Sequence, residues 1–384
     1  SNSAMYQIQN LARKGLVVVS VNYRLGPLGF LRLKDITDGK IDATGNEGLK
    51  DQRLALQWIQ ENIEYFGGNK NNVTICGLSS GSWSCALQIA AGHNHLFNNA
   101  ICQSGGLDAV ADLEKANKWG ELFLESFQHL GLNSDDLMEC PWEKIVDAAK
   151  MLRHYQLSED GSLVLPEVGF LPVIDNDFLK DDFEITFNES EINLIAGSTL
   201  DEYNLWSFFH PKIRENDETY ILKRLKKIFI SDHIEEILNV YEEFLETKNL
   251  AKIFSAVMTD ISFGIPTNNI LKKKNGKSYG YLFSTQSSLM SGELGSFHAS
   301  ELPYLFGVHK LHPYSGWSSE NGESVSHNIQ SAWKNFASFG NPSFDDFSWH
   351  EYNEDQLTLL GSAVKTISNP FLERYNLVEQ YKKF

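Results

Sequence analysis

The sequence contains few cysteines and no long hydrophobic run, and each of these absences excludes a class of protein. Its 384 residues include only four cysteines, Cys76, Cys85, Cys102 and Cys140. Four scattered thiols in a chain of this length do not form the disulfide framework of a small secreted domain, so we expect a reducing, cytoplasmic location. No apolar run reaches the roughly 18 residues that a membrane-spanning helix needs, and we expect no membrane partner.

Positive charge is also scarce. Lys and Arg number 33 against 50 Asp and Glu, which gives a net charge of −17. Proteins that bind phosphate backbones carry basic patches, so nucleic acid is not an expected partner. Hydrophobic residues make up 42% of the chain and charged residues 22%, a composition typical of globular proteins.

Short apolar runs alternate with amphipathic stretches in the first quarter of the chain. Residues 16–21 (LVVVSV) predict a strand that is buried on both faces. Residues 51–66 place apolar side chains at helical spacing and end at a Gly-Gly pair. A strand at 72–76, a helix at 83–91 and a strand at 100–103 follow. This order predicts an α/β fold with a mostly parallel central sheet flanked by helices.

The later part of the chain predicts more strands, separated by long helix-prone segments. Strands are expected at 192–196, 279–284 and 357–360. The segments at about 107–190 and about 204–276 are much longer than ordinary crossovers. We interpret both as helical insertions that cap one edge of the sheet, and expect a single domain over 1–384.

A serine lies at the junction of a predicted strand and a predicted helix. Residues 77–81 (GLSSG) fit the pattern G-x-S-x-G, which alone is a weak signal. Between a strand and a helix, however, the pattern predicts a nucleophile elbow with Ser79 as the nucleophile. Gly77 and Gly81 have no side chains and would leave space for the tight turn. The alternative is a turn serine that only caps the following helix.

A serine hydroxyl becomes a nucleophile only beside a base that is held by a third group. Among eleven histidines, His298 follows a late predicted strand and is favoured over His327 and His350. The acid is expected after the preceding strand, where Asp201 and Glu202 are neighbours. Residue type and position do not choose between these two carboxylates.

A series of motifs runs in order from about residue 10 to about residue 345. They are 22–30 (NYRLGPLGF), 45–52 (GNEGLKDQ), 66–77 (FGGNKNNVTICG), 103–105 (QSG), 201–202 (DE), His298 with 301–304 (ELPY), 333–337 (WKNFA) and 340–342 (GNP). Together they resemble the type-B carboxylesterases, the family that includes cholinesterases and bacterial para-nitrobenzyl esterases.

The resemblance implies an α/β-hydrolase fold and a catalytic triad of Ser79, Glu202 and His298. In that family the acid is the second residue of an Asp-Glu pair, which selects Glu202. The backbone N–H of Ser80 is implied as an oxyanion donor. The implied activity is hydrolysis of carboxylic esters, broadly small or aromatic ones, through a serine acyl-enzyme. Such chemistry requires neither a metal nor a cofactor.

Two departures from the family pattern stand out. The elbow has Leu78 and Ser80 where the family usually has Glu and Ala, so a buried carboxylate behind the triad is replaced. The family's His-Gly-Gly loop, whose N–H groups complete the oxyanion hole, occurs nowhere in the chain. The first strands of the family's sheet are expected to be missing with it. We therefore expect an additional N-terminal segment to complete the site. It would be either a partner, a separate N-terminal chain of the same protein left by cleavage, or a part of the gene that this sequence does not include.

Four aromatic residues near the elbow and the acid are candidates to line the substrate pocket, although core packing explains them equally well. They are Trp83, Trp206, Phe208 and Phe209. The alternative function is a catalytically silent binding protein of the same fold, or an inactive fragment that needs the separate N-terminal segment. Silent members of the family typically lack a triad residue, whereas candidates for all three are present here.

Overall fold

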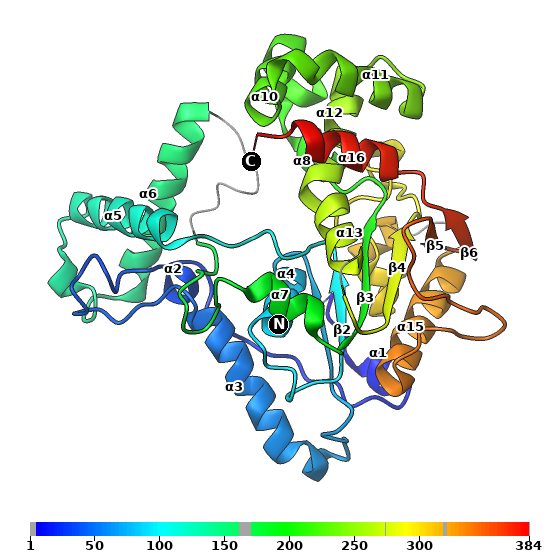
Figure 1. Ribbon diagram of the computed structural model, residues 1–384, viewed down its shortest axis with the longest axis horizontal. Helices are drawn as coiled ribbons and strands as arrows, with labels where there is room; N and C mark the ends of the chain where they lie inside the picture. The colour runs from blue at the N-terminus through cyan, green and yellow to red at the C-terminus, as the bar shows by residue number, and fades with distance from the viewer. Residues whose placement is uncertain (1–4, 161–169, 273, 318–320, 384) are drawn as a thin grey trace.

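A six-stranded sheet forms the centre of the computed structural model, which describes residues 5–160, 170–272, 274–317 and 321–383 (Figure 1). The strands lie in sequence order, the first five pair in parallel, and the sixth pairs antiparallel. They are β1 (Thr74–Leu78), β2 (Asn99–Gln103), β3 (Asn193–Thr199), β4 (Ser278–Phe283), β5 (Gln356–Leu360) and β6 (Val364–Ser368). The carboxyl ends of β1 to β4 therefore meet at one edge.

Each connection between consecutive parallel strands contains at least one helix. Before β1 come α1 (Gln9–Ala12), α2 (Pro27–Phe30) and α3 (Glu47–Asn62), and α4 (Ser80–Ala90) follows β1. Between β2 and β3 lie α5 (Leu113–His129), α6 (Trp142–Asp160) and α7 (Phe183–Glu189). Between β3 and β4 lie α8 (Asn204–Phe209), α9 (Pro211–Arg214), α10 (Glu218–Ile228), α11 (Ile234–Leu245), α12 (Leu250–Thr259) and α13 (Ile265–Lys272). The last are α14 (Leu302–Leu305), α15 (Gly322–Phe339) and α16 (Leu372–Tyr381).

Side chains of the central strands alternate between two hydrophobic cores, one on each face of the sheet. Ala100 and Leu194 belong to the core that α3, α4 and α7 cover. Their neighbours Ile101 and Ile195 belong to the core that α15 covers. Burial on both faces explains why these strands are continuously apolar rather than alternating with polar residues.

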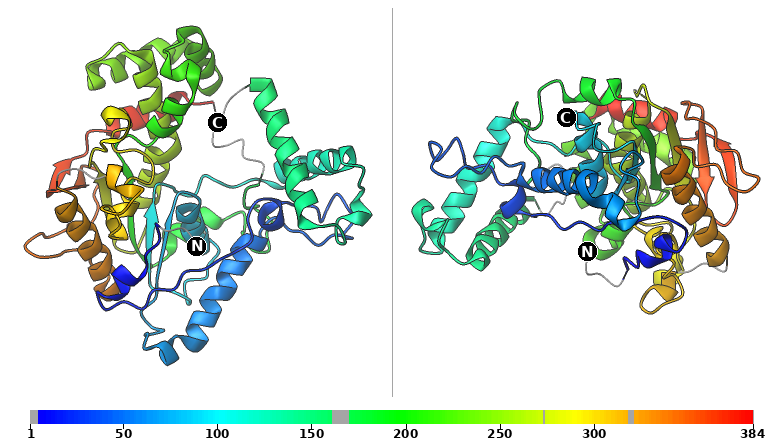
Figure 2. Two further views of the ribbon diagram at one scale, coloured as in Figure 1. Left: turned by 180° about the vertical axis from the view of Figure 1, so that it is seen from behind. Right: turned by 90° about the horizontal axis from the view of Figure 1, so that it is seen from below.

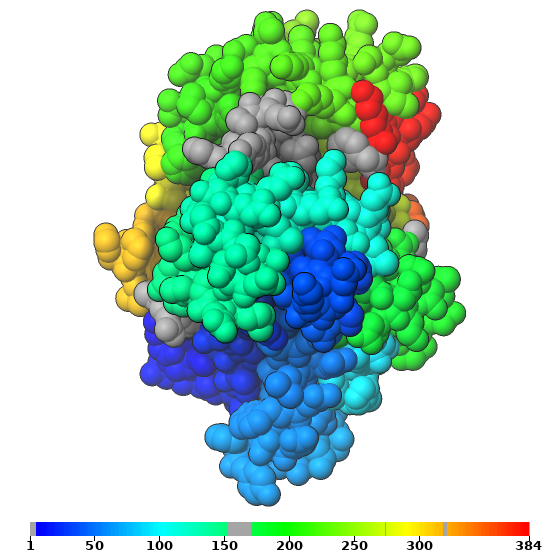
Figure 3. Space-filling model, turned by 90° about the vertical axis from the view of Figure 1, so that its left-hand side faces the viewer, coloured from blue at the N-terminus to red at the C-terminus, as the bar shows by residue number. Residues whose placement is uncertain are grey.

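Two groups of helices extend beyond the sheet. Helices α10, α11, α12 and α16 share one core, and α5 and α6 pack with residues 31–41 around another. The two groups lie on different sides of the molecule when it is seen from behind (Figure 2, left). Figure 3 shows α5 and α6 (teal) in front, with the helices of residues 218–259 (green) above them.

The prediction of a strand at residues 16–21 is wrong. The segment is irregular in the structure, with Leu16 and Val18 packed against a core and Val17 and Val19 exposed by 45% and 42%. A strand needs a hydrogen-bonded neighbour, and no described residue forms a ladder with this segment. The β-branched residues predicted an extended backbone, but residue type alone does not specify a neighbouring strand to pair with.

Among the described residues, no helix is long and apolar enough to cross a membrane. The structure holds Cys76, Cys85, Cys102 and Cys140 as free thiols.

Candidate active site

Ser79 lies between the last residue of β1 and the first residue of α4. Its backbone has φ 57° and ψ −120°, a conformation that is unusual for a residue with a side chain. The strand therefore turns into the helix with no loop residue other than the serine, and α4 begins at Ser80, earlier than the expected 83. The strained turn and the adjoining elements are those of a nucleophile elbow.

The two glycines of the elbow do not contribute equally. A Cβ at Gly77 would overlap the backbone carbonyl of Gly81, whereas a Cβ at Gly81 would meet nothing within 4 Å. Only Gly77 is required for the close approach of strand and helix. The N–H of Ser79 donates to the carbonyl of Gln103 at 2.8 Å, which ties the elbow to the end of β2.

Glu202 and His298 are joined directly. Glu202 follows β3, His298 follows β4, and Nδ1 of the imidazole lies 2.5 Å from Oε2 of the carboxylate. The backbone N–H of His298 also donates to the carbonyl of Glu202 at 3.3 Å. Glu202 is completely buried and His298 is 8% exposed, so the pair is shielded from water.

The second oxygen of the Glu202 carboxylate is also bound. Its Oε1 accepts hydrogen bonds from the hydroxyl of Ser104 at 2.5 Å and from the N–H of Thr199 at 2.7 Å. With His298, the buried carboxylate has three hydrogen-bond partners, which offset the cost of its burial. The polar chain thus runs from β4 through β3 to the end of β2.

Asp201 has a different role from its neighbour. Its Oδ2 accepts from the N–H of Ser296 at 2.8 Å, and its own N–H donates to the carbonyl of Ser296 at 2.9 Å. A Cβ at Gly295 would overlap the Asp201 carboxylate, so the chain passes very close there. Asp201 holds the loop that carries His298, whereas Glu202 contacts the imidazole.

Two aromatic rings pack beside the imidazole. The ring centroids of Trp206 and Phe263 lie 5.0 Å and 4.8 Å from that of His298, and the two rings stack on each other at 5.7 Å. Phe263 was not expected from the sequence, because it lies far from every motif. In the sequence, only the apolar run around Phe263 and the proline at 266 distinguish this segment from its surroundings.

A third buried carboxyl group lies near the pair. Glu301 is completely buried, and its Oε1 accepts from Nε2 of Gln103 at 3.1 Å. Burial and the charge of Glu202 raise the pKa of Glu301 to about 7. Burial lowers the pKa of His298, but the charge and hydrogen bond of Glu202 and the charge of Glu301 outweigh it, so the pKa of His298 is raised overall.

The remaining predicted residues lie in different places. Ser80 and Trp83 line a cavity of about 480 Å³, and the indole N–H of Trp83 donates to Asp108 at 3.1 Å. Phe208 packs against Phe209, which is 65% exposed, and neither lines this cavity.

The histidines considered as alternatives to His298 lie at the surface. His327 contacts Asp345, and both side chains are more than half exposed. His350 is exposed as well. In the described part of the chain, no three His, Cys, Asp or Glu side chains gather as metal ligands would.

Comparison with known proteins identifies the family. The model of the carboxylesterase family matches residues 1–377. The chain belongs to the carboxylesterase family. This member is 31% identical over 374 residues to the para-nitrobenzyl esterase of Bacillus subtilis (strain 168), a match that covers 95% of the chain and 73% of the relative. It is 29% identical to the bile salt-activated lipase of Mus musculus over 99% of the chain and 66% of that protein.

Solved structures show the same fold. This carboxylesterase family member superimposes on a carboxylesterase of Geobacillus stearothermophilus with a TM-score of 0.83 and 26% identity. The match covers 98% of the chain and 78% of that structure. The fold is therefore the α/β-hydrolase fold, and the chain spans part of the length of the relatives that it matches.

Proposed function

We propose that this chain hydrolyses carboxylic esters through an acyl-enzyme on Ser79, with His298 as the base and Glu202 as the group that orients it. The observation that carries the proposal is the 2.5 Å contact between Nδ1 of His298 and Oε2 of Glu202. Ser104, which donates to the same carboxylate, directly follows Gln103, whose carbonyl accepts from the N–H of Ser79. A carboxylate on Nδ1 fixes the tautomer in which Nε2 can accept a proton.

The first half of the reaction acylates the serine. Oγ of Ser79 bonds to the ester carbonyl carbon while Nε2 of His298 takes the hydroxyl proton. The negative charge moves to the carbonyl oxygen, where the N–H of Ser80 donates, since the first N–H groups of α4 have no partner within the helix. The imidazolium then protonates the alcohol oxygen as the C–O bond breaks.

The second half frees the acid. His298 takes a proton from water as the water oxygen adds to the acyl carbon, and it returns that proton to Oγ of Ser79 as the acyl–serine bond breaks. The carboxylic acid leaves and the serine hydroxyl is restored. Glu202 remains ionised throughout, because its part is to orient and stabilise the imidazolium.

Small or aromatic esters are the proposed substrates. The cavity beside Ser80 is lined mostly by apolar side chains, including Trp83, Leu107, Ile261 and Pro266. An apolar cavity of about 480 Å³ suits a compact uncharged ligand. Trp206 and Phe263 add an aromatic surface beside the imidazole.

The test is hydrolysis of para-nitrophenyl acetate, butyrate and benzoate by the wild type and by Ser79→Ala. We expect release of nitrophenolate from the wild type and none above background from the folded variant. Equal turnover by both proteins would refute the assignment of Ser79. A folded wild type that binds these esters without turnover, even when an oxyanion loop is supplied, would favour a silent binding protein.

We also propose that a polypeptide segment outside this sequence completes the oxyanion hole. In support, β1 pairs only with β2 among the described strands, so its other edge is open, and an open edge readily takes up another strand. A missing oxyanion donor costs about 3–4 kcal/mol of transition-state stabilisation. Intact-mass measurement of protein purified from its source shows which polypeptides are present, and an ester hydrolysis assay of the same sample measures its activity. Full activity in a chain of only these residues would contradict the proposal.

A cytoplasmic location is proposed as well. It is supported by the four free thiols, which a reducing compartment would preserve. Cell fractionation with an antibody tests the location, and recovery of the protein outside the cell or in an oxidising compartment would contradict it.

A further inference from the structure

The helix that carries Phe263 changes its form in the middle. Helices α12 and α13 are continuous through Asp260–Gly264, which is π-helical, and the N–H of Ile265 donates to the carbonyl of Asp260, five residues back. Pro266 follows directly. A proline cannot donate to the carbonyl four residues before it, and its ring would clash there. The wider turn accommodates the proline, and such segments are frequent at functional sites.

The side of this π-helical segment away from the imidazole is fixed by a buried charge pair. Asp260 is 2% exposed and Arg374 of α16 is 5% exposed, and a guanidinium nitrogen of Arg374 lies 3.1 Å from Oδ2 of Asp260. The hydroxyl of Tyr241 donates to the same oxygen at 2.6 Å. The guanidinium also lies 3.8 Å from the ring centroid of Phe244 and 4.8 Å from that of Phe371. Arg374 is therefore held by aromatic rings as well as by charge.

A second contact joins α16 to the segment. A Cβ at Gly264 would overlap the hydroxyl of Tyr375, so the tip of the Tyr375 side chain lies against the backbone of Gly264. Arg374 and Tyr375 thus hold the first and the last residue of the π-helical segment from the same helix.

The same helix also contacts His298 and the residue that follows Glu202. Phe263 packs on the imidazole of His298 at 4.8 Å between ring centroids. Oγ1 of Thr259 accepts from the N–H of Tyr203 at 3.0 Å, and Tyr203 directly follows Glu202. These two contacts come from the residue before Asp260 and from the third residue after it. A rotation of the helix at Asp260 would displace both.

We propose that Arg374 is a positioning residue for the Glu202–His298 pair, acting through Asp260 and the π-helical segment. The inference rests on the proposed function in so far as that pair is the catalytic one. Displacements of about 1 Å at a reacting group can lower a rate by about a hundredfold. The C-terminal helix α16 therefore contributes to catalysis without contacting the substrate.

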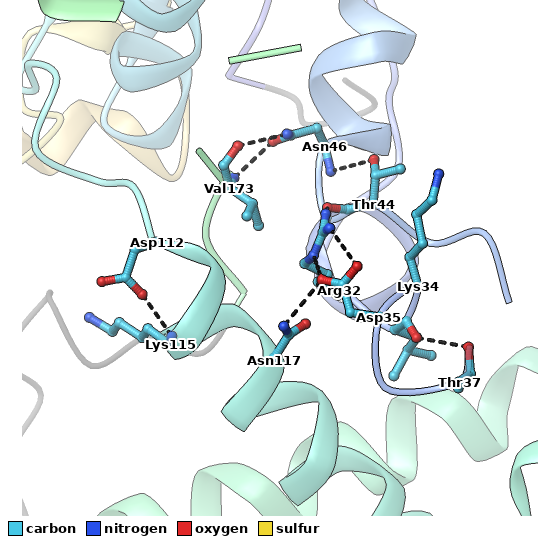
Figure 4. Close-up of polar contacts among 12 residues, drawn as sticks. Arg32, Lys34, Asp35, Thr37, Thr44, Asn46, Asp112, Lys115, Asn117 and Val173 are labelled. Atoms are coloured by element: carbon cyan, nitrogen blue, oxygen red, sulfur yellow. Dashed lines mark hydrogen bonds and ion pairs between the residues drawn. The ribbon is translucent and has the colours of Figure 1, made fainter. Parts of the chain in front are cut away.

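The test variant is the double substitution Arg374→Met with Asp260→Asn, which removes both charges and leaves neither one unpaired in the interior. The control is Arg32→Met with Asp35→Asn, a pair in which the arginine is buried and the aspartate side chain is 40% exposed. Arg32 is 7% exposed, and its Nε lies 2.7 Å from Asp35. Figure 4 shows this pair beside Asn117 of α5, in the other group of helices. The control thus removes an arginine–aspartate pair that has no contact with the catalytic pair.

Two readouts separate positioning from stability. The first is the proton NMR signal of the Nδ1–H of His298, which a 2.5 Å hydrogen bond to a carboxylate moves downfield of the amide region. It reports the geometry of the pair whether or not an ester is turned over. The second is kcat for para-nitrophenyl butyrate, measured well below the Tm of each variant.

We expect the double variant to shift or broaden the downfield signal and to lower kcat by about 10- to 100-fold, with KM changed less. The control should leave the signal in place and kcat within about twofold. A folded double variant with an unchanged signal and kcat would overturn the proposal and leave Arg374 a structural role only. If the signal changes while the wild type hydrolyses no ester, the inference stands and the proposed function fails.

If the double variant does not fold, Tyr241→Phe is the variant that tests the proposal. It removes only the hydroxyl that donates to Asp260 and keeps the ring beneath Arg374. A perturbed downfield signal in this variant supports the proposal, and an unchanged signal with unchanged kcat overturns it.

Discussion

Ser104 and Glu202, 98 residues apart in the sequence, are joined by a hydrogen bond of 2.5 Å between the hydroxyl and Oε1. Ser104 directly follows β2, and its backbone φ of 57° is as unusual as that of Ser79. The carboxylate that contacts His298 is therefore fixed from two neighbouring strands. Ser104 therefore helps to hold the Glu202 carboxylate in its orientation toward His298.

Replacement of Ser104 by Ala should lower kcat by about tenfold and leave KM nearly unchanged. A hydrogen bond to a charged group contributes about 1.5–3 kcal/mol, and its loss weakens the hold on Glu202. Steady-state kinetics with a para-nitrophenyl ester measure the effect. Ser126→Ala is the control, because this buried hydroxyl donates only within α5, to the carbonyl of Leu122. Equal losses in both variants would contradict a specific role for Ser104.

The neighbouring carboxylates should respond differently to amide substitution. In Glu202→Gln, the amide would donate to Nδ1 of His298 and impose the wrong tautomer, so we expect kcat to fall by about 10³-fold or more. In Asp201→Asn, the side-chain oxygen can still accept from the N–H of Ser296, so we expect a loss below about tenfold. The ratio of the two kcat values shows which carboxylate orients His298. A larger loss of kcat in Asp201→Asn would assign that role to Asp201 instead of Glu202.

Replacement of Glu301 by Gln should move the acid limb of the kcat/KM profile to lower pH. The charge of Glu301, which develops as pH rises through about 7, is one cause of the raised pKa of His298, and His298 must be neutral to accept the serine proton. Removal of that charge lets the imidazole lose its proton at lower pH. A profile unchanged from pH 5 to 9 would contradict this electrostatic link.

The same substitution has a stability signature with a definite sign. The folded pKa of Glu301, about 7, lies above its ordinary value of 4.5. Its contribution to stability is therefore fully present below about pH 4.5 and is lost as pH rises through about 7. The Tm of Glu301→Gln relative to the wild type should thus rise between pH 5 and 8. A difference that falls with pH would show that the group is ionised in the fold.

Gly77→Ala should destabilise the protein by about 1–3 kcal/mol or more, because the new methyl group overlaps the backbone carbonyl of Gly81. Gly81→Ala is the matched control on the other side of the serine. Its Cβ meets open space within a helix, where Ala is favoured over Gly by about 0.5–1 kcal/mol. Thermal unfolding compares the two, and equal destabilisation would contradict the assignment of the tight contact to Gly77.

Much of the fold could be predicted because its signals are local. The apolar runs of β2, β3, β4 and β5 and the strand–serine–helix order of the elbow lie within short stretches of sequence, and the structure places elements there. Residues 16–21 failed because a strand depends on a neighbour. Strand β6 was missed because it is a short edge strand with half-exposed and exposed residues.

The site was less predictable where it depends on packing between distant segments. Ser79 and His298 follow from the elbow pattern and from chain order, and Glu202 required the family resemblance. The hydroxyl of Ser104 and the ring of Phe263 meet the pair, and the guanidinium of Arg374 meets Asp260, only through the tertiary fold. No spacing in the sequence encodes such contacts, although Pro266 within a helical stretch marks where the helix must change form.

Intact-mass spectrometry after exposure to an organophosphate ester tests whether Ser79 is an activated nucleophile. We predict a single phosphoryl adduct on the wild type, mapped by peptide analysis to residues 77–81 and absent from Ser79→Ala. Reaction should slow in Glu202→Gln, because the imidazole then lacks its orienting carboxylate. A folded wild type that forms no adduct, or an adduct that persists in Ser79→Ala, would contradict the account.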